Sequence, residues 1–197
     1  MPRPALHDTD TMLDAARDLL LGQGARAATV EAIAQTSGAP SGTIYHRFGS
    51  RDELVARLWI RGVQRSQAAF FAVTEGLPPR DAVLAGGLSI LDFCAAEPAD
   101  AQLLVAFRHD DLVRAAPTGA LAEELEQLNR PVERAVVDLA RGLYGRASRA
   151  ALDRVLLAVF DLPYGAVRRH MIAREPLPRG LRGDLARAIA AVVDQGP

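Results

Sequence analysis

The chain has no lysine and few aromatic residues, and its charges almost cancel. All of its 23 basic residues are arginine, and 24 acidic residues leave a formal net charge of −1 and an isoelectric point of about 6.4. A balance of this kind gives no long-range attraction to nucleic acid. Any binding of a charged partner must therefore come from a local arrangement of side chains.

Cysteine and long apolar runs are also scarce. The single Cys94 excludes an internal disulfide. The apolar run from Ala82 to Leu91 is about ten residues long, whereas a helix that spans a bilayer needs roughly twenty. The first residues lack the apolar run and small-residue cleavage site of a secretory signal. We therefore expect a cytoplasmic protein with no membrane partner.

The motifs of common enzyme classes are missing as well. The four histidines, at positions 7, 46, 109 and 170, do not form the HExxH or ExxH spacings of zinc and di-iron sites. There is no glycine-rich phosphate loop and no GxSxG motif. The one local cluster of metal-binding side chains, His109-Asp110-Asp111, is more typical of a charged helix end. The sequence predicts no catalytic residue, no metal and no cofactor.

What the chain does have is helical periodicity from end to end. Apolar residues make up 49% of it against 24% charged residues, which is enough for a buried core. The apolar positions recur at spacings of three and four, and the alternation of strands is nearly absent. We therefore expect an all-α protein of about nine helices, with a helix-turn-helix module of three helices over residues 1–50 and a helical bundle over residues 51–197. Pro131 and Pro163 lie inside two of these helices and are expected to kink them. The predicted helices cover residues 9–21, 30–36, 41–47, 50–73, 80–96, 98–108, 119–143, 148–173 and 181–194.

The third predicted helix is short and commits little to the core. Only Ile44 and Phe48 look buried, and the other positions present polar or small side chains. It follows the second helix after the turn Ser37-Gly38-Ala39, which is the pattern of a helix-turn-helix unit whose second helix enters the DNA major groove. An ordinary helical corner with a polar face has the same spacing, so the pattern alone leaves both interpretations open.

Residues 9–54 resemble the DNA-binding signature of TetR-family transcriptional regulators. The residues at the family's spacing are Gly38, Gly42-Thr43, Tyr45, Phe48, Ser50 and Asp52-Glu53-Leu54. The remaining residues match only in length and helical character. The resemblance implies a helix-turn-helix domain that binds double-stranded DNA, followed by a body that binds a small-molecule effector and forms a homodimer.

The resemblance places the candidate DNA contacts on the third helix and at two helix starts. These candidates are Thr29, Ser41, Gly42, Thr43, Tyr45, His46, Arg47 and Arg51. Arg47 is suited either to a bidentate contact with guanine, worth roughly 1–3 kcal/mol, or to a plain phosphate contact. Thr29 and Arg51 lie at helix N-termini, which favour phosphate. Residues 1–51 contain five arginines and five acidic residues, so we expect few phosphate contacts and a shallow salt dependence of DNA binding.

The predicted body supplies weaker candidates. Possible walls and anchors of an effector pocket are Trp59, Phe70, Phe93, Phe107, Leu128, Tyr144, Phe160 and Tyr164, with His109, Asn129, Asp161 and His170 as polar groups. A dimer interface of the last two long helices is expected to use Leu152, Val155, Leu156, Val159, Val167, Leu185, Ile189 and Val192. For each single pocket candidate, a place in the core or on the surface is the more common role, and the interface residues also suit packing inside one protomer. Cys94 is a candidate oxidant sensor but is more typical of a small core residue.

A ladder of arginines follows the fourth predicted helix. Arg57, Arg61 and Arg65 recur at a spacing of four, which favours a solvated or salt-bridged helix face. In the family this helix transmits movement of the body to the DNA-binding module. The sequence therefore predicts a dimeric repressor that a small molecule releases from a palindromic operator. The alternative is a helical ligand-binding or protein-interaction module without DNA binding.

Overall fold

The computed structural model describes residues 8–107 and 119–196, and within these ranges the chain is helical without a strand. The helices are α1 Thr9–Gln23, α2 Val30–Ser37, α3 Ser41–Phe48, α4 Arg51–Thr74, α5 Pro79–Ala96, α6 Pro98–Ala106, α8 Ala120–Gln127, α9 Arg130–Tyr144, α10 Arg149–Leu156, the π-helical turn η1 Leu157–Asp161, α11 Leu162–Ala173 and α12 Leu181–Asp194. The prediction of an all-α protein is confirmed.

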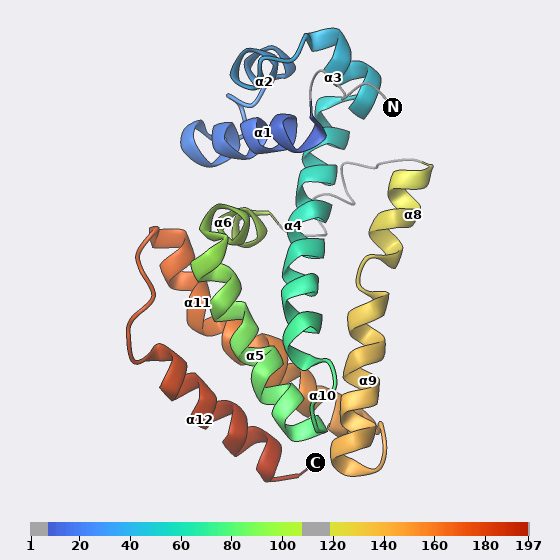
Figure 1. Ribbon diagram of the computed structural model, residues 1–197, viewed down its shortest axis with the longest axis vertical. Helices are drawn as coiled ribbons and strands as arrows, with labels where there is room; N and C mark the ends of the chain where they lie inside the picture. Colours follow the sequence, from blue (N-terminus) through green and yellow to red (C-terminus); the bar gives the residue numbers. More distant parts are fainter. Residues whose placement is uncertain (1–7, 108–118, 197) are drawn as a thin grey trace.

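The helices form two regions joined by one long helix (Figure 1). We call α1–α3 the head and α5–α12 the body; α4 runs from the head along the body. Helix α5 lies at the centre of the body, where it contacts α4, α6, α9, η1, α11 and α12. Within the described ranges no single helix is long and apolar enough to cross a membrane, and α5 and α6 meet that test only as a pair bent by 109°.

Local sequence signals set the start of several helices. The hydroxyls of Thr29, Ser50 and Ser148 each accept a hydrogen bond from the backbone amide three residues later, at 3.2, 3.1 and 3.3 Å. These N-caps satisfy amides that have no partner within their helix. At the end of α2, Gly38 has a φ of +71°, a conformation that costs a glycine little. Local interactions within residues 29–50 therefore determine the helix-turn-helix geometry.

The two internal prolines are accommodated in different ways. The sequence predicts one kinked helix over 119–143, but α8 ends at Gln127 and α9 begins at Arg130. Pro131 then lies in the first turn of α9, where its missing amide leaves no bond unmade. Pro163 lies two residues beyond η1, whose wider turn fits a residue that cannot donate to the preceding turn.

Each region has its own apolar core. The head core includes Met12, Ile33, Ile44 and Leu54, and the body also contributes to it through Leu103 of α6. The body core surrounds α5, where Gly86 and Gly87 permit a close approach. A Cβ atom at Gly86 would lie 2.5 Å from the Phe70 ring, and one at Gly87 would lie 2.9 Å from the Ala158 carbonyl oxygen.

Candidate nucleic-acid interface and body cavity

Helix α3 has one buried face and one face open to solvent. Ile44 and Phe48 are buried, as the sequence predicts. Gly42, Tyr45 and His46 are exposed, with Tyr45 at 50%. Ser41, Thr43 and Arg47 are half-buried beside them. The predicted contact residues of α3 thus form one continuous surface of small, hydroxyl-bearing and basic side chains.

The two arginines assigned to this surface also contact the protein itself. Arg47 Nη1 donates to the Thr9 hydroxyl on α1 at 2.8 Å. Arg51 Nε donates to the Ala28 carbonyl at 2.7 Å, and its guanidinium also reaches the Ala25 carbonyl. Arg51 therefore fixes the segment that precedes α2. Its phosphate contact stays a prediction, as does that of Thr29, which is exposed and caps α2.

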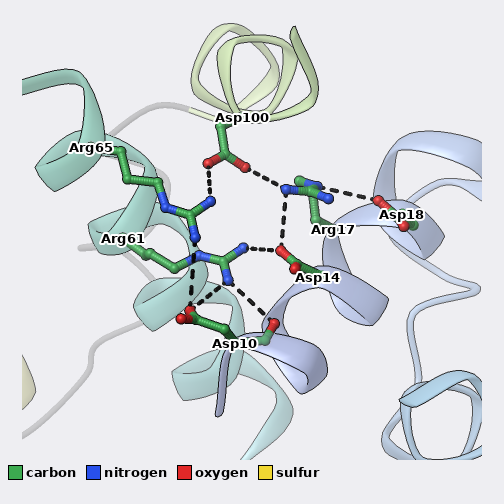
Figure 2. Close-up of polar contacts among 7 residues, drawn as sticks. All are labelled: Asp10, Asp14, Arg17, Asp18, Arg61, Arg65 and Asp100. Atoms are coloured by element: carbon green, nitrogen blue, oxygen red, sulfur yellow. Dashed lines mark hydrogen bonds and ion pairs between the residues drawn. The ribbon is translucent and has the colours of Figure 1, made fainter. Parts of the chain in front are cut away.

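A network of seven charged residues lies where α1 of the head meets α4 and α6, and we call it the junction network (Figure 2). Its members are Asp10, Asp14, Arg17 and Asp18 of α1, Arg61 and Arg65 of α4, and Asp100 of α6. At its centre is Asp100, whose side chain is only 1% exposed. Its Oδ1 accepts from Arg17 Nη1 at 2.8 Å and its Oδ2 accepts from Arg65 Nη1 at 2.9 Å.

The remaining members link α1 to α4. Arg61 donates to Asp10 at 2.8 Å and to Asp14 at 2.6 Å. Arg17 lies 3.2 Å from the carboxylates of both Asp14 and Asp18. Together with Asp100, these pairs hold α1, α4 and the first turn of α6 against one another.

The electrostatics of Asp100 follow from its surroundings. Burial alone would raise the pKa of the Asp100 carboxyl, because the charged form loses water. The hydrogen bonds and positive charges of Arg17 and Arg65 outweigh this effect and hold the pKa below its ordinary value. Asp100 is therefore ionised at neutral pH. Nothing in the sequence distinguishes Asp100, since an acidic residue in the first turn of a helix is commonplace.

Further contacts join the head to the body around α6. Leu103 of α6 is fully buried in the head core. The indole Nε1 of Trp59 on α4 donates to the Phe107 carbonyl at 3.2 Å, just past the end of α6. Arg174, at the end of α11, donates to the Leu21 carbonyl at the end of α1. The position of α6 is thus tied directly to that of the head.

On its other side α6 borders an apolar cavity of about 280 Å³. Four of the predicted aromatic wall residues line it, namely Phe70, Phe93, Phe160 and Tyr164. Ala101, Leu104 and Val105 of α6 form part of its wall. Of the other candidates, Asp161 is also on the wall, Trp59 lies in the head core, Phe107 packs against that core and Tyr144 donates to the Val193 carbonyl at 3.1 Å. His109, Asp110 and Asp111 lie outside the described residues.

Cys94 also faces this cavity but is not set up for thiol chemistry. Its side chain is buried. Burial raises the pKa of the Cys94 thiol to about 11, so the thiol stays protonated at neutral pH. A protonated thiol is a poor nucleophile. Cys94 therefore acts here as an apolar wall residue.

The eight residues predicted for a dimer interface separate into two groups. Val155, Val159, Val167, Leu185 and Ile189 are buried in the core of the protomer. Leu152 and Val192 are half-buried, and Leu156 is exposed. Other exposed apolar side chains of α10, η1 and α11 are Leu157, Tyr164 and Ile172. The outer surface of these helices therefore keeps apolar groups that the protomer leaves uncovered.

Comparison with known proteins agrees with this geometry. Residues 12–58 match the family model described as bacterial regulatory proteins, tetR family. This match spans the head and the first part of α4, about a quarter of the chain. The comparison with curated proteins gives no match.

Solved structures resemble the whole chain at low sequence identity. A ketosteroid transcriptional regulator, KstR2 of Mycobacterium tuberculosis, is 16% identical, with a TM-score of 0.67 over 97% of this chain and 95% of its own. A transcriptional regulator from Rhodococcus sp. is 20% identical, with a TM-score of 0.69 over 95% and 97%. FadR from Bacillus subtilis, solved in complex with stearoyl-CoA, is 14% identical, with a TM-score of 0.68 over 94% and 97%. The fold is that of TetR-family regulators.

Proposed function

As a chain with the tetR-family N-terminal domain and the TetR-like fold, this protein is, we propose, a sequence-specific DNA-binding transcriptional regulator. The observation that carries the proposal is the outward face of α3, where Gly42, Tyr45 and His46 are exposed beside Arg47 on a helix-turn-helix head. The proposal divides the chain into a DNA-binding domain, residues 1–50, and an effector-binding and dimerisation domain, residues 51–197.

The regulator acts as a homodimer on a palindromic operator. A two-fold dimer presents two α3 helices to successive major grooves, about 34 Å apart. The exposed apolar side chains Leu156, Leu157 and Ile172 favour a partner protomer on α10, η1 and α11. The buried members of the predicted interface, such as Val159 and Ile189, support those helices from within.

A small molecule in the body cavity releases the regulator from DNA. Helix α6 lines the cavity with Ala101, Leu104 and Val105, and it carries Asp100 and Leu103 into the junction with the head. A ligand that displaces α6 therefore disturbs the contacts that set the angle of the head. The ligand shifts the protein toward the non-binding arrangement only as far as its affinities for the two arrangements differ. In this scheme the protein is a repressor.

The experiment that tests the proposal is selection of bound sequences from random duplex DNA with the purified full-length protein. One palindromic motif is the expected result. Binding of that motif is then compared between the wild type and the double variant Tyr45→Ala with Arg47→Ala, which is expected to bind at least about a hundredfold more weakly. Arg141→Ala is a matched control, since it removes an exposed arginine from α9.

Three results would contradict the proposal or a part of it. Recovery of no sequence above background at low salt would leave the head without a DNA-binding role and favour the alternative of a ligand-binding or protein-interaction module. Unchanged binding by the double variant, with its helical content and oligomeric state intact, would remove α3 from the interface. Sedimentation of the free protein as a monomer at micromolar concentration would contradict the dimer.

A further inference from the structure

We propose that the body cavity binds a compact ring-containing molecule that carries a protonated amine. This inference rests on the proposed function, because it names the chemical class of the effector for the same cavity. It is carried by three features of the cavity: its size, its aromatic walls and the one acidic side chain among its described lining residues.

The size of the cavity suits a compact ligand of about two rings. Its volume is about 280 Å³, and an engineered protein cavity of about 150 Å³ binds benzene. The cavity is lined by residues of α4, α5, α6, α9, η1 and α11 and is only partly enclosed, since Asp161 and Tyr164 of its lining are exposed. A molecule with the bulk of naphthalene or of a fused alicyclic pair therefore fits within it.

The walls are rich in aromatic rings. Phe70 of α4, Phe93 of α5 and Phe160 of η1 all line the cavity. The rings of Phe70 and Phe160 lie 6.1 Å apart between centroids at an interplanar angle of 32°. The faces of such rings attract both other rings and cations. The walls thus suit a flat apolar body with a positively charged substituent.

The polar groups of the cavity are unequally available to a ligand. Gln67 Nε2 already donates to the Leu128 carbonyl at 2.9 Å, and the Ser89 hydroxyl donates to the Gly86 carbonyl at 2.7 Å. The Asp161 carboxylate, by contrast, has no hydrogen-bond or ion-pair partner among the described residues. Tyr164, whose side chain is likewise exposed, lines the cavity three residues away in sequence.

The charge of Asp161 decides the sign of the ligand. It is the one acidic side chain among the described residues that line the cavity, and none of these residues is basic. An ammonium group beside Asp161 and Tyr164 leaves the ring system among the three phenylalanines. A carboxylate in the same place would face Asp161 without a compensating cation from the described lining.

A series of three ligands that share the naphthalene ring and differ in their polar substituent tests the inference on the full-length protein. These are 2-naphthylmethylamine, 2-naphthylmethanol and 2-naphthoate, each titrated by calorimetry at pH 7 without DNA. We expect the amine to bind about five-fold more tightly than the alcohol, because a partly solvated charge pair contributes at this level. The naphthoate is expected to bind most weakly.

Variants locate the effect at Asp161. Asp161→Asn is expected to reduce the affinity for the amine about five-fold and to leave that for the alcohol unchanged. The matched control is Asp153→Asn, an exposed acid of α10 that does not line the cavity and is paired with Arg149. Val105→Phe, which fills part of the cavity, is expected to weaken binding of the amine and the alcohol together.

Three results would overturn the inference. They are an alcohol or a naphthoate that binds as tightly as the amine, an amine preference that survives in Asp161→Asn, and no binding of any of the three at millimolar concentration. Because the titrations use no DNA, they are independent of the operator experiment. Selective amine binding without a selected DNA motif leaves this inference standing and removes the regulator. Selection of one DNA motif, without a preference of the cavity for the amine, would support the regulator and overturn this inference.

Discussion

Arginine–carboxylate contacts lie at opposite ends of the body and differ in their exposure to water. In the junction network, Arg17 and Arg65 donate to Asp100 at 2.8 and 2.9 Å. At the far end, where α5 begins and α12 ends, Arg80 donates to both oxygens of Asp194 at 2.7 and 2.6 Å (Figure 1). Both side chains of this distal pair are 50% exposed, whereas Asp100 is 1% exposed.

The difference shows that the donor–acceptor distance does not predict how much each ion pair contributes to stability. Water solvates Arg80 and Asp194 almost as well when they separate, so their shorter contacts add little to stability. Asp100 has no such alternative, because loss of its partners would leave a charge in the protein interior. The buried pair also joins the head to the body, whereas the distal pair joins two helices within the body. The junction network is therefore the place where both the stability of the protein and the position of the head depend most on a single residue.

The largest expected effect follows from removal of Asp100. Asp100→Ala leaves Arg17 and Arg65 facing each other and an empty space between α1, α4 and α6. We expect the free energy of unfolding to fall by about 3–5 kcal/mol, as for other broken buried pairs. Urea denaturation followed by circular dichroism measures this loss. A loss under about 1 kcal/mol would mean that water reaches Asp100 and that the contrast with the distal pair is false.

Removal of one arginine at a time sharpens the comparison within the junction. The Arg17 side chain is 15% exposed and bonds to Asp100 besides its contacts with Asp14 and Asp18. Arg17→Met is expected to cost about 1.5–3 kcal/mol, the range for a hydrogen bond to a charged group. Arg65→Met is expected to lower the free energy of unfolding by less, because the Arg65 side chain is 37% exposed. The same denaturation experiment checks this order, and an equal or reversed order would show that exposure does not grade the pairs.

A smaller effect is expected in the pH dependence of stability. The pKa of Asp100 is lowered from an ordinary value of 3.8 by Arg17 and Arg65 despite its burial. The unfolded chain therefore takes up this proton first, so the stabilisation is complete above the ordinary pKa and is lost as the pH falls through it toward the folded value. Asp100→Asn should therefore make the free energy of unfolding depend less on pH in the acid range. The pKa of Asp194 is lowered in the same direction by Arg80, but its exposure predicts a weaker flattening in Asp194→Asn. Unfolding free energies measured between pH 7 and pH 3 test the pair of variants.

The head was the part of the molecule that the sequence predicted best, and the reason is local chemistry. The caps at Thr29 and Ser50 and the left-handed glycine at Gly38 act within a few residues, so their effect is visible in the sequence. The burial of Ile44 and Phe48 follows from helical spacing in the same way. Such signals do not depend on what packs against them.

The contacts of the junction and the cover of the proposed dimer surface could not be predicted in this way. Helical spacing indicates that Arg61 and Arg65 share a face of α4, but only the packing of α1 and α6 brings Asp14 and Asp100 to them. The residues predicted for a dimer interface on α10–α12 present a different difficulty. A periodic apolar face does not reveal whether the same chain or a second one covers it. Val159 proved to be covered within the protomer, and Leu156 did not.

The smallest expected effect is that of the distal pair itself, and it completes the comparison. Arg80→Ala removes a guanidinium that donates two hydrogen bonds to Asp194 with favourable distances. We expect no change in the free energy of unfolding beyond the error of the measurement at 150 mM salt, because both groups regain water and the released side chain regains its freedom. Arg17→Ala, measured beside it, removes the same side chain from the buried network and must show a clear loss. If Arg80→Ala were as costly as Arg17→Ala, short two-point geometry rather than burial would govern these pairs. Burial would then not distinguish Asp100 from the other paired carboxylates as the residue through which α6 positions the head.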